Sequence, residues 1–88
     1  MSDTNVFQKV RATVAATFHV SPEEIITSET TSTDVDGWDS LSHSILLMNV
    51  EEAFGIELPF EAAYELANVG ELGDLVIATL AEKKQAAP

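Results

Sequence analysis

Apolar residues at helical spacing constrain the fold of this chain more than any other feature. Residues 4–18 place one at every fourth position on a single helix face: Val6, Val10, Val14 and Phe18. No segment alternates apolar and polar residues as a half-buried strand does. The 88 residues are enough for one compact domain and too few for two. We therefore predict an all-α fold and a single domain over residues 1–88, with a frayed tail at 83–88.

The connection after this first helix is long and polar. Residues 19–39 contain Pro22 and many Ser, Thr and Asp residues, so neither helical nor strand periodicity continues. Loops of this length inside compact domains are usually functional or disordered. Four apolar residues argue against disorder, because apolar side chains at intervals can hold a loop against a core: Ile25, Ile26, Val35 and Trp38. We also predict that Trp38 packs against the helices and holds the end of the loop in place.

A second helix is predicted after the connection. Asp39 is a good N-cap for it, and Gly55 after Phe54 supplies a left-handed C-cap. The buried stripe of this helix is expected to contain Leu41, Leu46, Leu47, Val50 and Phe54. The segment that follows, residues 56–59, is predicted to be an extended link.

Two more helices complete the predicted fold. Pro59 suits the first turn of a short third helix that continues through Leu66. Asn68 followed by Glu71 resembles a capping box for the last helix, as Asp3 or Thr4 could cap the first. The sequence thus predicts a small four-helix bundle with a long first loop and a short third helix.

Strong acidity limits the partners of the chain. It has 15 acidic and 4 basic residues, a formal net charge of −11. This charge repels nucleic acids and favours docking onto basic patches of other proteins. There is no cysteine, so the chain has no thiolate of its own for metal binding or catalysis. The polar start and the lack of a long apolar run predict a cytoplasmic protein that does not insert into membranes, and we expect a monomer.

The stretch from Gly37 to Leu41, Gly-Trp-Asp-Ser-Leu, is the most informative motif. Asp39 as a cap places Ser40 in the first turn of the second helix, where the hydroxyl is exposed. The positive end of the helix dipole and unpaired backbone N–H groups would favour a phosphate ester there. Taken alone, the tripeptide Asp39-Ser40-Leu41 is better explained as ordinary helix capping.

The motif and its surroundings resemble the acyl carrier protein family, including its aminoacyl and peptidyl carriers. Members have Gly-x-Asp-Ser-Leu at the start of the second helix, and this chain continues with Leu46–Met48, Glu51–Pro59 and Asn68–Gly70 in similar order and spacing. The resemblance implies that a separate, magnesium-dependent phosphopantetheinyl transferase attaches 4′-phosphopantetheine from coenzyme A to Ser40. Asp39 would cap the helix and contribute to recognition. The arm would carry an acyl or aminoacyl group as a thioester.

The resemblance also implies partners: a loading ligase and downstream synthase or transferase enzymes that read the second helix. The candidate contacts are Leu41, Ser44, Ile45, Met48, Glu51, Glu52, Glu57 and Glu61. Fatty-acid-synthesis carriers usually have acidic residues shortly after the Asp-Ser-Leu triplet, where this chain has Ser42, Ser44 and Ile45. Trp38 is more similar to specialised or aminoacyl and peptidyl carriers. The cargo itself cannot be read from the sequence.

Three alternatives remain to be weighed. A hydrolase would need Ser40, His43 and an aspartate, but there is no Gly-x-Ser-x-Gly elbow and Asp39 is committed to capping, so we predict no catalytic residues. We interpret His43 as a surface histidine or one that contacts a partner. The acidic run at 34–39 fails the EF-hand pattern, so we predict no metal site. A helical interaction adaptor without a prosthetic group shares the predicted fold and differs only in whether Ser40 is modified.

Overall fold

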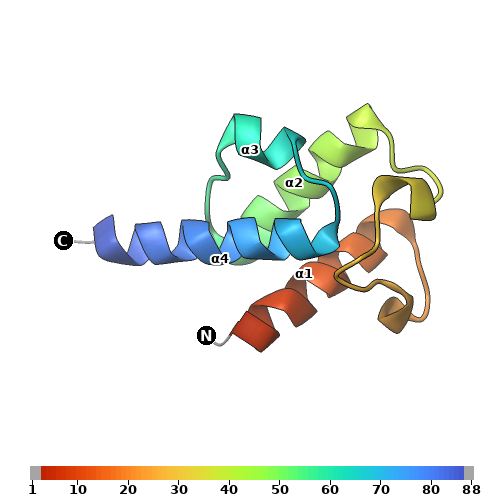
Figure 1. Cartoon of the computed structure of the whole chain (residues 1–88), viewed down its shortest axis with the longest axis horizontal. Coiled ribbons are helices and arrows are strands. Elements are labelled where there is room, and N and C mark those ends of the chain that lie inside the picture. The colour runs from red at the N-terminus through yellow and green to blue at the C-terminus, as the bar shows by residue number, and fades with distance from the viewer. Residues whose placement is uncertain (1–2, 87–88) are drawn as a thin grey trace.

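The computed structural model describes residues 3–86, and every regular element in this range is helical (Figure 1). The four α-helices are α1 (Asp3–Phe18), α2 (Ser40–Phe54), α3 (Phe60–Tyr64) and α4 (Val69–Ala86). Two short 3-10 turns, Glu23–Ile25 and Ser32–Asp34, lie in the long connection between α1 and α2. The structure confirms the predicted all-α bundle, with its long first loop and short third helix.

The core lies where α1 packs against both α2 and α4. Its side chains are apolar and almost completely inaccessible to solvent. They include Val6, Val10 and Val14 of α1, Leu46 and Val50 of α2, and Leu72 and Val76 of α4. Fully burying one such side chain contributes about 1.5–3 kcal/mol. The every-fourth-residue pattern of α1 therefore predicted the correct buried face.

The ends of α2 confirm the predicted caps. The Asp39 carboxylate accepts a hydrogen bond from the backbone N–H of Ser42, with 2.9 Å between Oδ1 and N. Gly55 has a φ of +65°, the left-handed conformation that ends helices. The expected buried stripe was wrong for Leu41, which is 73% exposed. Leu41 lies five positions before Leu46, and that spacing turns it well away from the buried face.

The predicted Asn68 cap of α4 is confirmed, because its side-chain oxygen accepts a hydrogen bond from the backbone N–H of Glu71 at 2.9 Å. The remaining helix ends differ from the prediction. α1 begins at Asp3, so Asp3 and Thr4 lie within the helix instead of capping it. Pro59 precedes α3 as its N-cap, and the helix ends at Tyr64, two residues before the predicted end at Leu66. α4 continues through Ala86, so residues 83–86 of the expected frayed tail are helical. Residues 87 and 88 lie outside the described range.

The start of α4 fixes the long connection. The backbone N–H of Val69 donates to the carbonyl oxygen of Thr30 at 2.9 Å, and that of Gly70 donates to Ser28 at 2.8 Å. A Cβ atom at Gly70 would lie only 2.8 Å from the Ser28 carbonyl oxygen, so the two segments could not approach this closely with another residue there. Ile26 is also buried, at 1% exposure, whereas the expectation was wrong for its neighbour Ile25, which is 60% exposed. The loop is therefore held against the bundle, and its fixed position defines where α2 begins.

Candidate functional site

Ser40 is the first residue of α2 and is exposed to solvent. Gly37, with a φ of +85°, turns the chain just before it, a conformation that strains other residues. Asp39 is extended and uses its carboxylate to cap the helix. Within residues 3–86, the Ser40 hydroxyl has no hydrogen-bond partner. The hydroxyl is therefore free for chemistry at a position that the local backbone defines.

The electrostatics at the start of α2 suit an anionic ester on Ser40. Backbone N–H groups of the first helical turn point out of the helix, and the helix dipole places positive potential there. The pKa of Asp39 is lowered from its ordinary value, mainly because the backbone N–H and then the hydroxyl of Ser42 donate to its carboxylate. A covalently bound phosphodiester would occupy the same positive region. The start of α2 therefore suits this phosphodiester, because the Ser40 hydroxyl is free and lies in the positive region of the helix N-terminus.

Trp38 packs as predicted. Its indole stacks on the Phe18 ring at the end of α1, with ring centroids 5.0 Å apart and planes 21° apart. The side chain is half-buried. Aromatic pairs in this range contribute beyond the apolar area they bury. The stacking anchors the last part of the loop next to Ser40.

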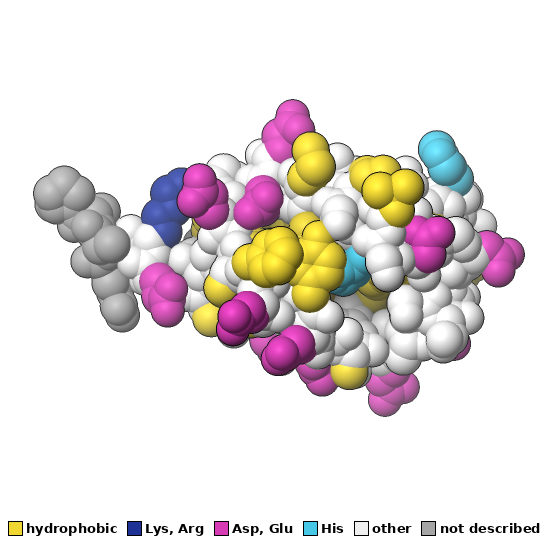
Figure 2. Space-filling model, turned by 90° about the horizontal axis from the view of Figure 1, so that it is seen from above, with side chains coloured by type: hydrophobic (Ala, Val, Ile, Leu, Met, Phe, Trp, Pro, Cys, Tyr) yellow, Lys and Arg dark blue, Asp and Glu magenta, His cyan; other side chains and the backbone are white. Residues whose placement is uncertain are grey.

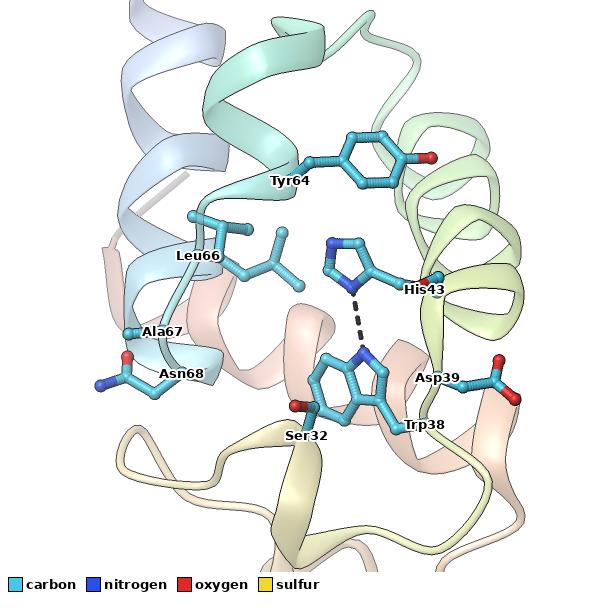
Figure 3. Close-up of a pocket in the computed structure, with 10 residues that line it drawn as sticks. Ser32, Trp38, Asp39, His43, Tyr64, Leu66, Ala67 and Asn68 are labelled. Atoms are coloured by element: carbon cyan, nitrogen blue, oxygen red, sulfur yellow. Dashed lines mark hydrogen bonds between the residues drawn. The ribbon is translucent and has the colours of Figure 1, made fainter.

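His43 does not behave as the surface histidine we predicted. It is half-buried, and its Nδ1 accepts a hydrogen bond from Trp38 Nε1–H at 3.0 Å (Figure 3). This bond leaves Nε2 with the proton, which it donates to the carbonyl oxygen of Ala63 at 2.8 Å. Both ring nitrogens are therefore occupied by contacts that connect the loop, α2 and α3.

The sequence contained a signal for the position of His43. The residue precedes Leu46, Leu47 and Val50 by three, four and seven positions, which places it on the buried stripe of α2. Only its polarity led to the surface interpretation. Its partners, an indole five residues earlier and a carbonyl twenty residues later, are not evident from the sequence pattern.

A cavity of about 290 Å³ opens beside Ser40 (Figure 3). His43 and Trp38 form one side of it, and the segment from Tyr64 to Asn68 forms the opposite side. The Tyr64 ring meets His43 edge-on, with ring centroids 5.3 Å apart, and its hydroxyl bonds to the Ser44 hydroxyl. Ser40 thus lies at the rim of a cavity whose wall is partly aromatic and partly polar.

The predicted partner-contact residues are mostly accessible. Figure 2 shows hydrophobic side chains in the middle of one face, with acidic side chains around them. Leu41, Ile45 and Met48 are exposed on α2, and Glu52, Glu57 and Glu61 are exposed on α2, the α2–α3 connection and α3. Two candidates have structural bonds instead: Glu51 accepts from the backbone N–H of Leu58 at 2.8 Å, and Ser44 bonds to Tyr64.

Two further findings concern only residues 3–86. None of the helices in this part of the chain is both long and apolar enough to cross a membrane. No group of three or more histidine and acidic side chains converges there as the ligands of a metal ion would.

Comparison with known proteins agrees with this geometry. Residues 8–76 match the family described as "Phosphopantetheine attachment site". An acyl carrier protein of Thermosynechococcus vestitus is 34% identical over 76 residues, which cover 86% of this chain and 93% of the relative. An acyl carrier protein of Guillardia theta is 30% identical over the same shares. The solution structure of a holo acyl carrier protein from Geobacter metallireducens superposes with a TM-score of 0.81, at 31% identity and 94% coverage of both chains.

This fold is that of a helical carrier domain, with a free serine hydroxyl at the start of its second helix. The chain belongs to the acyl carrier protein family, whose members carry acyl groups on covalently attached 4′-phosphopantetheine.

Proposed function

We propose that Ser40 is the attachment point of the phosphopantetheine arm. The observation that supports this most is the exposed Ser40 hydroxyl, without a partner in the described part of the chain, at the N-terminus of α2. In the attachment reaction, Ser40 Oγ forms a bond to the β-phosphorus of coenzyme A. The bond from that phosphorus to the oxygen of the departing 3′,5′-ADP breaks, and the hydroxyl proton is lost. The attached group supplies a thiol, which this cysteine-free chain lacks.

The role of this chain in that proposal is to carry and present, without catalysing. A serine nucleophile would need a nearby base, and His43 is the only histidine on α2. Its Nδ1 accepts from Trp38 and its Nε2 donates to the Ala63 carbonyl, so neither nitrogen is available to take a proton from Ser40. Partner enzymes would therefore perform both the attachment and the later chemistry.

The proposed partners are a phosphopantetheinyl transferase, an acyl- or aminoacyl-loading ligase, and downstream synthase or transferase enzymes. Their docking is supported by the exposed Leu41, Ile45 and Met48 beside Ser40 and by the net charge of −11, which favours basic surfaces. Asp39 would contribute through the conformation it gives to the start of α2. A cytoplasmic location and a monomeric state remain predictions.

Intact-mass measurement tests the proposal. Wild type, Ser40→Ala and the control Ser42→Ala would be incubated with coenzyme A, magnesium and a broad-specificity phosphopantetheinyl transferase. We expect the mass of one phosphopantetheine group to be added to wild type and Ser42→Ala, and none to Ser40→Ala. Addition to Ser40→Ala would refute the proposed site. No addition to any of the three folded proteins would favour the adaptor without a prosthetic group.

A further inference from the structure

Trp38 and His43 lie on either side of Ser40 in the sequence, and a hydrogen bond joins their side chains (Figure 3). Because Asp39 is the N-cap of α2, Trp38 directly precedes the cap and His43 is the fourth residue of the helix. In many helices an apolar pair at these two positions packs together and fixes the angle at which the chain enters the helix. Here an indole and an imidazole occupy the two positions, and we call this pair the aromatic staple.

The contact within the aromatic staple is directional. The planes of Trp38 and His43 are 17° apart, and the ring centroids are 6.0 Å apart although the bonded nitrogens are separated by only 3.0 Å. The two rings therefore meet at their edges, through the hydrogen bond, and do not lie face to face. Unlike an apolar contact, a hydrogen bond requires a defined partner and distance. The staple thus holds the end of the loop against the second turn of α2 in one geometry.

Each end of the staple is anchored to a different helix. The Trp38 indole stacks on Phe18 of α1, with ring centroids 5.0 Å apart. His43 Nε2 donates to the carbonyl oxygen of Ala63 in α3 at 2.8 Å. The staple therefore places the start of α2 relative to both α1 and α3. Ser40 lies between the two stapled residues and is placed together with them.

The first turn of α2 depends on few other contacts. A Cβ atom at Gly37 would meet no other atom of the described chain within 4 Å, so packing does not hold the turn at this point. Asp39 caps the helix, but the Ser42 hydroxyl donates to the same carboxylate and does not reach back to the Asp39 N–H as in a capping box. Ser40 and Leu41 are exposed. The cap and the staple are thus the main constraints on the position of Ser40.

We propose that Trp38 and His43 are positioning residues for the transfer of phosphopantetheine to Ser40. In that reaction Ser40 Oγ approaches the β-phosphorus of coenzyme A in line with the departing oxygen of 3′,5′-ADP. The orientation of the first turn of α2 decides whether Oγ can reach this line. A misplacement of about 1 Å can lower a rate about 100-fold. This inference rests on the proposed attachment at Ser40, and it adds the way in which the chain itself orients the hydroxyl.

Hydrogen exchange at the indole tests whether the staple is closed in solution. Trp38 is the only tryptophan of the chain, so its Nε1–H gives a single indole signal in NMR spectra. His43→Gln keeps an N–H donor within reach of the Ala63 carbonyl but has no acceptor at the position of Nδ1. We expect the indole proton of wild type to exchange with water at least about tenfold more slowly than that of His43→Gln, because the hydrogen bond must open first.

Steady-state kinetics of the transfer give the decisive readout. The values of kcat and KM for the carrier would be measured with coenzyme A, magnesium and a broad-specificity phosphopantetheinyl transferase. We expect Trp38→Phe and His43→Gln each to lower kcat about tenfold and to change KM less than about twofold. The reason is that Ile45 and Met48 stay exposed on later turns of α2 for docking, while Oγ loses its orientation. The double variant should have the kcat of a single variant, because both substitutions remove the same bond.

Two further variants separate positioning from stability. Val6→Ala truncates a buried side chain about 18 Å along α1 from Phe18, so it should lower the unfolding midpoint without changing kcat or KM. His43→Asn presents an oxygen acceptor at the position of Nδ1 and should retain more of the wild-type kcat than His43→Gln. Circular dichroism would establish that every variant is folded at the assay temperature.

Several results would overturn the inference. These are fast exchange of the indole proton in wild type, a wild-type kcat for folded Trp38→Phe and His43→Gln, or multiplied losses in the double variant. An equal loss of kcat in Val6→Ala, or no advantage of His43→Asn over His43→Gln, would also contradict the staple. Each of these outcomes leaves attachment at Ser40 intact. Failure of wild type to accept phosphopantetheine would instead contradict the proposed function, and this inference with it.

Discussion

α2 is held to its two neighbours in different ways. Towards α1 it presents Leu46 and Val50, which are completely buried among apolar side chains. Towards α3 and its preceding connection it uses three side-chain hydrogen bonds. His43 donates to the Ala63 carbonyl, the hydroxyls of Ser44 and Tyr64 bond to each other, and the Glu51 carboxylate accepts from the Leu58 backbone N–H. The first contact is a conventional core, whereas the second is a polar seam.

The difference between core and seam matters for function. Apolar packing is non-directional and tolerates exchange of similar side chains, so it defines the bundle but not the fine shape of its end. Hydrogen bonds require defined partners and distances. Because Ser40 and its cavity lie at the end of the bundle where the seam begins, their shape depends on the polar contacts. Unfolding measurements on variants of the core, the loop contact, the seam and the cap test this division of roles.

Truncation in the core should have the largest effect. Leu46→Ala removes a completely buried side chain between helices and should lower the free energy of unfolding by about 2–5 kcal/mol. Leu41→Ala is the matched control on the same helix, since Leu41 is 73% exposed, and should change stability by less than about 0.5 kcal/mol. Urea unfolding followed by circular dichroism measures both. Equal losses would show that α2 has no distinct buried face.

Crowding the close contact between the loop and the start of α4 should cause the next largest loss in the free energy of unfolding. Gly70→Ala places a Cβ 2.8 Å from the Ser28 carbonyl oxygen, and relief of this clash should cost about 1–3 kcal/mol. Gly73→Ala, in the same helix, meets only Phe7 Cδ1 at 3.4 Å and should be neutral or stabilising by up to about 1 kcal/mol. If both variants unfold at the same urea concentration, the close contact between loop and α4 does not limit stability.

Removal of the hydrogen bond that holds the seam residue His43 from the loop side should lower stability less. Trp38→Phe retains a ring to stack on Phe18 and leaves His43 Nδ1 without its donor. We expect the free energy of unfolding to fall by about 1 kcal/mol. Urea unfolding by circular dichroism is suitable because the variant has no tryptophan. A loss as large as that of Leu46→Ala would mean that the seam, and not the core, dominates the stability of α2.

Removal of the Asp39 cap of α2 should have the smallest effect on stability, and the size of this effect should depend on pH. The pKa of Asp39 in the folded protein lies below its ordinary value of 3.8, so ionisation of this carboxylate favours the fold. Its contribution is present above pH 3.8 and is lost as the pH falls through the lowered pKa. The difference in unfolding midpoint between wild type and Asp39→Ala should therefore shrink in this range. Asp36→Ala, a control outside the cap, should show no such change; a pH-independent difference for Asp39→Ala would contradict the capping role.

Local chemistry made much of the fold predictable. Helix caps such as Asp39 and Gly55 depend on residues adjacent in sequence, and the α1 stripe depends on spacing alone, so both were correct. Leu41 was misplaced because α2 is apolar on two faces: one is buried, and the other contains the exposed Leu41, Ile45 and Met48. Composition cannot distinguish these faces without the positions of the neighbouring helices.

The site was predictable in part. Ser40 at the start of α2 follows from the motif and its cap, and Trp38 followed from its apolar surface. The role of His43 did not follow from the sequence, because its contacts with Ala63 and Tyr64 join residues about twenty positions apart in the chain. Such long-range polar pairs appear only when α3 is placed against α2. The cavity beside Ser40 could not be predicted from the sequence for the same reason.

The most direct test of the central claim is to locate the modification within the chain. Wild-type protein treated with coenzyme A and transferase would be fragmented intact in a mass spectrometer, and fragments that divide the sequence between Asp39 and Leu41 would be compared. We predict that the added mass of phosphopantetheine is confined to Ser40. Its location on Ser42, on Ser44 or anywhere else in the chain would contradict the assignment of Ser40 as the carrier residue.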